Sequence, residues 1–196
     1  MTDTLVPATT PARVRALLST MSVSSDIDGV LESMIAGATR AIEQYLGTSL
    51  ALESRVEERD IDPGQTLVWL DAFPVTGVTE IRNDPDWGFA STIAATDYRV
   101  ESEFGRIAFR FPLTEGRKAL QVTYTAGIGA TTEDIIDNAE EIATACDLQV
   151  AADYRSRNQS KTQSRGGPRG DLVTREHDQL IPKVRQILDR RRRVTV

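Results

Sequence analysis

The strongest constraint on the fold is one long helical pattern over residues 131–157, in which apolar side chains recur every three or four positions. Acidic residues such as Asp137 and Asp147 are expected on the opposite side. Thr131 and Asp134 have the spacing of a capping box, which predicts that the helix begins after Thr131. A β pattern precedes this helix and a basic stretch follows it. The expected apolar stripe consists of Ile135, Ala139, Ile142, Ala143, Cys146, Val150 and Tyr154.

Two further helices are predicted near the N-terminus, over 11–20 and 26–46. Thr10 is a suitable N-cap for the first and Ser25 for the second, and Gly47 is a suitable stop for the second. Small residues on the second helix let another helix approach closely. The side chains expected to face the core are Val14, Leu17 and Leu18 in the first helix, and Ile27, Val30, Leu31, Met34, Ala38, Ala41, Ile42 and Tyr45 in the second.

Between residues 50 and 126 the apolar pattern changes to a period of two, which predicts strands. Their short length and close spacing favour antiparallel hairpins, and residues 84–94 are expected to form an exposed loop tip. The predicted fold class is therefore α+β, a small helical bundle with an antiparallel β-hairpin insertion. The predicted strands are 51–59, 65–70, 77–83, 96–102, 105–111 and 117–126.

The end of the chain has a different composition. The stretch RNQSKTQSRGGPRGD contains no apolar residue to bury, which predicts a flexible basic linker over 158–172 between a main domain, 1–157, and a C-terminal tail, 173–196. In the tail, Pro182 suits the first turn of a short helix with one apolar stripe. Because so short a helix is unstable alone, we predict that it is a docking element.

Charge is unevenly distributed. Residues 155–193 contain twelve Lys/Arg and four Asp/Glu, although the whole chain has a net charge of −6. An acidic body with a basic tail indicates that the tail contacts something negative, either nucleic acid or an acidic protein surface. The alternative is solvated disorder over 158–170.

Few residues have a pattern that indicates catalysis or metal binding. His177 is the single histidine and has no cysteine nearby, although zinc needs convergent nitrogen and sulfur ligands. Asp84 and Asp86 resemble part of a calcium loop, but the proline between them favours a β-turn. The segment AGIGATTED matches a dinucleotide-binding pattern only in part and favours a tight turn before a capped helix. We predict no enzyme activity, no cofactor and no metal site.

The single cysteine, Cys146, excludes an internal disulfide and lies on the apolar stripe, which favours a small buried side chain over a reactive thiol. No stretch approaches the roughly 20 apolar residues that cross a membrane. The N-terminus lacks the pattern of a secretory signal. We therefore expect synthesis in a reducing cytoplasm and no membrane contact.

Five segments occur in a characteristic order: AIEQYLGTSL, LDAFPVTGVTEIRND, DYRVESEFGRIAFRF, LQVTYTAGIG and IPKVRQILDRRRR. This series resembles the head–tail connector (adaptor) family of tailed bacteriophages, from about Pro11 to Arg193. The order is more specific than any one segment. The chain departs from the family pattern in its basic insert at 158–170, and in four arginines where a tyrosine often precedes the final arginines.

The resemblance implies a structural protein of the virion neck. Copies of it would form a homo-oligomeric ring, usually twelve-fold, beneath the portal protein. The ring would extend the channel for double-stranded DNA, which passes without sequence-specific binding, and would carry a stopper or tail-completion protein. An alternative is an oligomeric nucleic-acid-binding accessory protein that uses the basic tail, and a salt-dependent gel shift distinguishes the two.

Two sets of residues are candidates for these contacts. We expect the apolar stripe of the C-terminal helix to bury against the portal while the arginines pair with its acidic groups: Val184, Ile187, Leu188, Arg190, Arg191, Arg192 and Arg193. The loop tip is the candidate for the tail-side contact, through Asp84, Asp86, Trp87 and Phe89.

Overall fold

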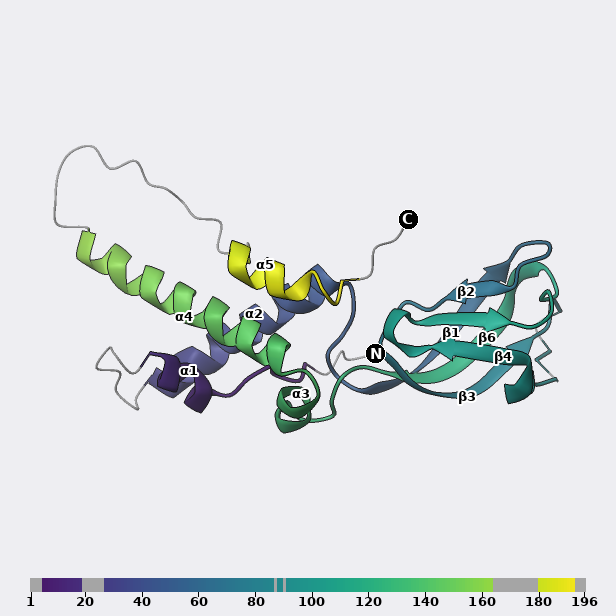
Figure 1. The fold of residues 1–196 in the computed structure, drawn as a ribbon, viewed down its shortest axis with the longest axis horizontal. Coiled ribbons are helices and arrows are strands. Elements are labelled where there is room, and N and C mark those ends of the chain that lie inside the picture. The colour runs from purple at the N-terminus through teal and green to yellow at the C-terminus, as the bar shows by residue number, and fades with distance from the viewer. Residues whose placement is uncertain (1–4, 19–26, 87, 90, 164–179, 193–196) are drawn as a thin grey trace. The chain divides into compact units, whose positions relative to one another are not determined.

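The residues that the computed structural model describes are 5–18, 27–86, 88–89, 91–163 and 180–192 (Figure 1). The chain forms two compact units. Residues 1–47 and 131–196 make a helical unit, and residues 48–130 make a β unit. Helices and antiparallel sheets are both present, which confirms the mixed α and β composition predicted from the sequence.

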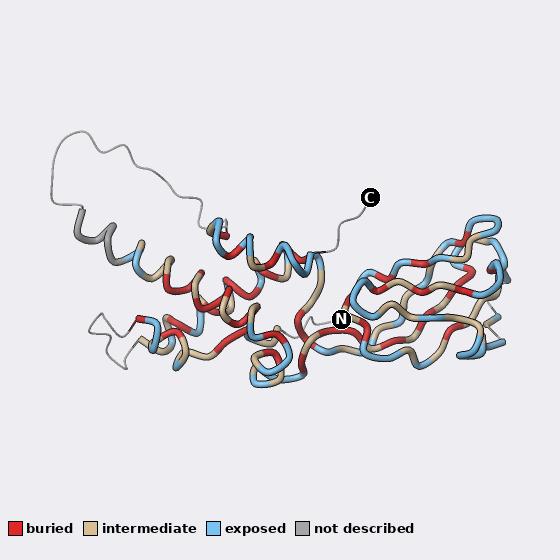
Figure 2. Tube along the Cα trace, viewed as in Figure 1, coloured by how far each residue is buried: buried red, intermediate tan, exposed pale blue. Residues whose placement is uncertain are grey.

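The helical unit is organised around α4, which packs against each of the other four described helices. Figure 2 shows buried positions along much of α4. Two predicted caps are present: Thr10 accepts a hydrogen bond from the Arg13 backbone N–H, and Gly47 ends its helix in the left-handed conformation with φ +73°. The described helices are α1 (Pro11–Leu17), α2 (Asp28–Leu46), α3 (Thr132–Asn138), α4 (Glu140–Gln163) and α5 (Pro182–Leu188).

The long helical pattern forms two helices instead of the single helix that was predicted. The break is at Ala139, whose φ of −150° and ψ of 60° are outside the helical region. The Ala139 N–H donates to the Ile135 carbonyl and closes α3, while its own carbonyl accepts the first bonds of α4. Glu140 and Glu141 then place negative charge at the new N-terminus. The capping box of Thr131 is confirmed. At its other end α4 continues through Gln163, so the first residues of the predicted 158–172 linker are helical.

Two polar side chains on α4 are buried because neighbouring segments cover them. Asp147, predicted on the outer side, accepts hydrogen bonds from the Thr9 hydroxyl at 2.6 Å and from Arg13 Nε at 3.2 Å. Gln149 accepts a bond from the Ile181 N–H at 3.0 Å, next to α5. These contacts attach the N-terminal segment and the start of α5 to α4, and sequence periodicity alone does not indicate them.

The buried face of α2 is turned relative to the predicted one. Ile35, Thr39 and Leu46 are buried, whereas Met34 and Tyr45 are only half-buried. The reason is that the N-terminal segment lies over Thr39, whose hydroxyl accepts a bond from the Ala8 N–H at 3.1 Å. Ile27, Val30 and Ala41 are also half-buried, and Leu17 of α1, predicted to face inward, is 41% exposed.

The β unit contains two three-stranded antiparallel sheets, in the orders β1-β6-β3 and β2-β5-β4. Side chains from both sheets form one apolar core, which includes Tyr124 and Ile107. Short 3-10 turns, η2 (Ala95–Asp97) and η3 (Ser102–Phe104), flank β4. The strands are β1 (Glu53–Ile61), β2 (Leu67–Trp69), β3 (Val75–Asn83), β4 (Tyr98–Glu101), β5 (Arg106–Phe109) and β6 (Gly116–Ala126).

The prediction of hairpins is wrong for most of these strands. Among the described strands, only β4 and β5 pair with a neighbour in sequence, while β6 lies between β1 and β3. An alternating pattern specifies which face of a strand is buried, but it does not specify the partner strand.

Candidate docking surfaces

The C-terminal helix α5 uses its apolar residues inside the chain. Val184 and Leu188 are fully buried where α5 packs on α4, and Ile187 is half-buried. Val184 and Leu188 are thus covered by their own bundle, so the predicted burial of these side chains against a portal would require α5 to leave α4. The helix is as short as expected, but α4 supplies the surface that stabilises it.

The arginines that follow α5 have different environments. Arg190 is exposed, Arg191 pairs with Glu141 of α4, and the Arg192 guanidinium lies 5.1 Å from the centre of the Tyr45 ring on α2. The Tyr45 hydroxyl donates a hydrogen bond at 2.5 Å to Asp189, which raises the pKa of Tyr45. These contacts hold the end of α5 against two other helices. Arg193 lies outside the described residues.

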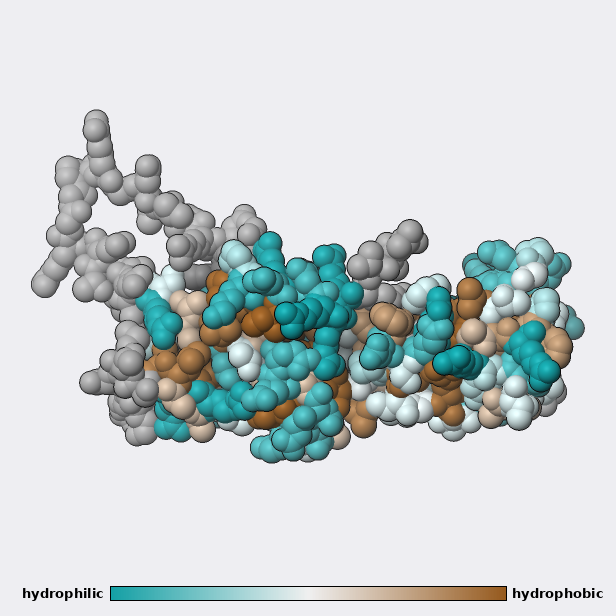
Figure 3. All heavy atoms as spheres, in the orientation of Figure 1, coloured by the Kyte–Doolittle hydropathy of each residue, from teal (hydrophilic) through white to brown (hydrophobic). Residues whose placement is uncertain are grey.

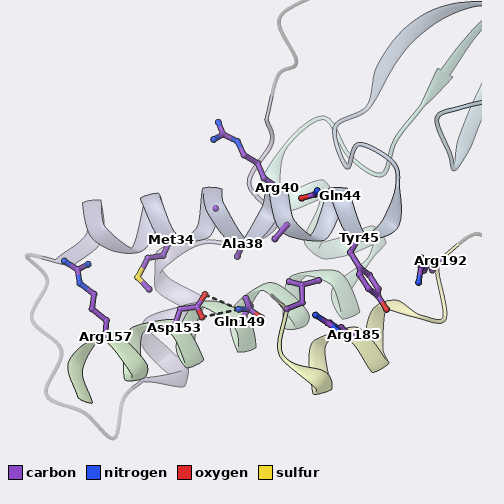
Figure 4. Close-up of a pocket in the computed structure, with 13 residues that line it drawn as sticks. Met34, Ala38, Arg40, Gln44, Tyr45, Gln149, Asp153, Arg157, Arg185 and Arg192 are labelled. Carbon is purple, nitrogen blue, oxygen red and sulfur yellow. Dashed lines mark hydrogen bonds between the residues drawn. The ribbon is translucent and has the colours of Figure 1, made fainter. Parts of the chain in front are cut away.

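A groove of about 810 Å³ lies between α2, α4 and α5 (Figure 4). Small residues of α2 line one side of it, and Arg40, Arg157, Arg185 and Arg192 are among the other residues that line it. Asp153 is the acidic residue in the groove, and its carboxylate accepts hydrogen bonds at 3.1 Å from the Gln149 amide. The other lining residues are Met34, Gly37, Ala38, Ala41, Gln44, Tyr45 and Leu180.

The predicted loop tip forms a tight turn in the β unit. The Asp84 carboxylate accepts a hydrogen bond from the Asp86 backbone N–H at 2.9 Å, which is typical of a turn and agrees with the turn predicted from the sequence. Phe89, at φ +45°, lines a second hollow of about 620 Å³ together with Arg117 and Lys118. Trp87 lies outside the described residues.

The described part of the chain contains no group of three or more His, Cys, Asp or Glu residues arranged to hold a metal ion. His177 is outside that part. None of the described helices is both long and apolar enough to span a membrane.

We expect Cys146 to resist thiol reagents in the folded protein. Its side chain is buried on α4, and this burial raises the pKa of the thiol from 9.0 to about 12. Because the thiolate is the reactive form, ionisation alone makes the folded thiol about a thousandfold less reactive than the unfolded one near pH 8. Because the pKa is higher in the folded chain, the thiol contributes its full share to the free energy of unfolding below pH 9. This contribution declines between pH 9 and about 12, where the thiol ionises in the unfolded chain but stays protonated in the folded one.

Modification by a coloured disulfide reagent, followed with and without denaturant, measures this protection. Equal rates in the two conditions would show that the thiol is accessible in the folded chain.

A family model described as head completion protein matches residues 9–194. A search of curated protein sequences finds no match. The fold is similar to a chain in a structure of the neck of an empty GTA particle computed with C6 symmetry, with a TM-score of 0.61, 22% identity, and coverage of 99% of this chain and 95% of that one.

Two further solved structures contain similar chains. One is the virion of a native gene transfer agent particle, with a TM-score of 0.60, 22% identity, and coverage of 98% and 94%. The other is the neck of a native GTA particle computed with C12 symmetry, with a TM-score of 0.56, 21% identity, and coverage of 100% and 97%. The family match confirms the resemblance drawn from the ordered segments. This chain belongs to the head completion protein family and is a structural, non-enzymatic virion protein.

Proposed function

We propose that this protein is a neck component of a tailed phage or phage-like particle, at the interface between head and tail. Copies of it would form a ring beneath the portal, extend the DNA channel and carry a stopper or tail-completion protein. One observation carries this proposal: the chain matches, over 99% of its length, the fold of a chain in a particle neck. Membership of the head completion family supports it.

A ring of about twelve copies is the expected assembly. The two neck structures with similar chains were computed with C6 and C12 symmetry, which is consistent with this number. A closed ring needs a heterologous contact, in which two different surfaces of each subunit meet. The acidic body of the chain would keep duplex DNA from adhering to the ring, since like charges repel.

The contacts with neighbours follow from the two candidate surfaces. For the portal we assign the exposed Arg190, because Val184 and Leu188 are already buried. Arg191 and Arg192 already contact Glu141 and Tyr45 within the chain. For the tail-side protein we assign the turn with Asp84 and Asp86 and the adjacent Phe89.

Particles made with and without this protein test the proposal. Without it, we expect heads that lose DNA and carry no tails, and in complete particles cryo-electron microscopy should show its density as a ring at the neck. Tailed, DNA-filled particles made in its absence would overturn the neck function. Tight DNA binding by the purified chain, lost at high salt, would favour a nucleic-acid-binding accessory protein instead.

A further inference from the structure

The groove between α2, α4 and α5 is positively charged, and two of the arginines that line it form no ion pair with a described residue. Four arginines and one aspartate line it, and that aspartate already accepts two hydrogen bonds from Gln149. Arg40 and Arg185 are exposed and form no ion pair with any described residue. In Figure 4 the Arg185 side chain lies on the side of α5 that faces α2, whereas the Arg40 side chain extends from α2 away from α4 and α5, at the rim of the groove. A negatively charged ligand would therefore complement the positive charge of the groove.

One wall of the groove is made of small residues of α2, and one of them is a glycine that the packing of the chain does not require. Gly37 of α2 lines it, and a Cβ added there would meet no atom within 4 Å. Glycine inside a helix costs about 1 kcal/mol relative to alanine. Packing within the chain does not demand a glycine here, so the position leaves room for a close approach from outside. Ala38 and Ala41 extend this small-residue wall.

The same unit carries an acidic surface at the corner between α3 and α4. Residues 131–154 contain no lysine or arginine, and the carboxylates of Glu133, Asp137 and Glu140 are exposed. These three carboxylates form no ion pair among the described residues. In Figure 3 hydrophilic residues cover the visible face of α3.

We propose that the groove binds the acidic α3–α4 corner of a second copy of the chain. The described structure shows no contact between this corner and the groove arginines of the same copy, so both surfaces are available to neighbours. A groove on one copy and a corner on the next make a heterologous, head-to-tail contact of the kind that closes into a ring. This inference rests on the proposed ring and names the two surfaces that build it.

Charge reversal with mixing is the first test, read by sedimentation and mass photometry of the full-length protein. The groove variant is Arg40→Glu with Arg185→Glu, and the corner variant is Asp137→Lys with Glu140→Lys. Each alone should self-associate about tenfold or more weakly than wild type, because like charges then face each other. An equimolar mixture should associate again, since every contact in an alternating assembly becomes complementary.

Such alternation closes only rings with an even number of subunits, so a recovered even-numbered ring supports the proposal strongly. Variants that associate as wild type does, or a mixture that stays dissociated, would overturn it. So would a wild-type protein that is monomeric at every concentration. None of these results decides the proposed neck function, which is tested separately by the particle experiment.

Gly37→Leu is the second test and does not depend on charge. The added side chain should fill the groove and weaken self-association about tenfold or more, while far-UV circular dichroism stays that of the folded protein. Gly29→Leu is the matched control, because Gly29 lies in the same helix, also has nothing within 4 Å of an added Cβ, and does not line the groove. If Gly37→Leu instead abolished portal binding and left self-association unchanged, the occupant would be the portal and the proposal would be overturned.

Discussion

Replacing Gly127 with alanine should unfold the β unit or cost it about 4 kcal/mol or more. Gly127 has φ +127°, which side chains rarely adopt, and an added Cβ would lie 2.1 Å from the Ala51 carbonyl oxygen. The obstacle is backbone, so a side-chain rotation cannot relieve it. The Gly127 N–H also donates a hydrogen bond at 3.0 Å to the Pro74 carbonyl, which holds the backbone just after the end of β6 in place.

Tryptophan fluorescence during urea unfolding measures this effect. Both tryptophans of the chain, Trp69 and Trp87, lie between residues 48 and 130, so their fluorescence reports on the β unit. Gly77→Ala is the matched control, because Gly77 is also in this unit and an added Cβ there meets nothing within 4 Å. An unfolding midpoint for Gly127→Ala equal to that of Gly77→Ala would show that the close approach to Ala51 is absent in solution.

Local signals in the sequence predicted the local structure well. The Thr131 capping box, the Gly47 stop and the alternating strands are short-range features, in which the residues that carry the signal also make the contact. Strand partners could not be predicted this way. β1 pairs with β6 across more than fifty residues, and nothing within either strand specifies that choice.

The helix break and the buried polar residues were missed for a related reason. The apolar stripe runs through Ala139 without interruption, so periodicity shows one helix where the backbone forms two. The charge of Asp147 predicts a position on the outer side, yet Thr9 and Arg13, far away in sequence, form hydrogen bonds with its carboxylate. A contact of this kind depends on two segments that are distant in sequence, so the pattern of either segment alone does not indicate it.

For the docking surfaces too, local features could be predicted from the sequence but contacts between distant segments could not. The short apolar stripe of α5 indicates that this helix needs a partner, but the sequence does not show that α4 of the same chain provides it. The small residues Gly37 and Ala41 of α2, which predict a close approach of another helix, line an open groove instead. The groove itself could not be predicted, because its walls come from three helices that are separated in the chain.

Val184→Asp should destabilise the helical unit by about 3–5 kcal/mol, since it places an unpaired charge in a fully buried position. The loss should release α5 from α4 and remove the Ile181 N–H from Gln149. Far-UV circular dichroism at the helix minimum, followed during urea unfolding, measures it. Tryptophan fluorescence reports on the other unit, and its transition should keep the wild-type midpoint.

Gln186→Asp is the control for Val184→Asp, because it introduces the same side chain into the same short helix at an exposed position. It should leave the helical transition within about 0.5 kcal/mol of wild type. The comparison decides between two roles for α5. If Val184 packs inside its own bundle, only Val184→Asp lowers stability in the isolated chain. If Val184 is instead reserved for a portal, both variants fold as wild type does, and Val184→Asp alone fails to bind the portal.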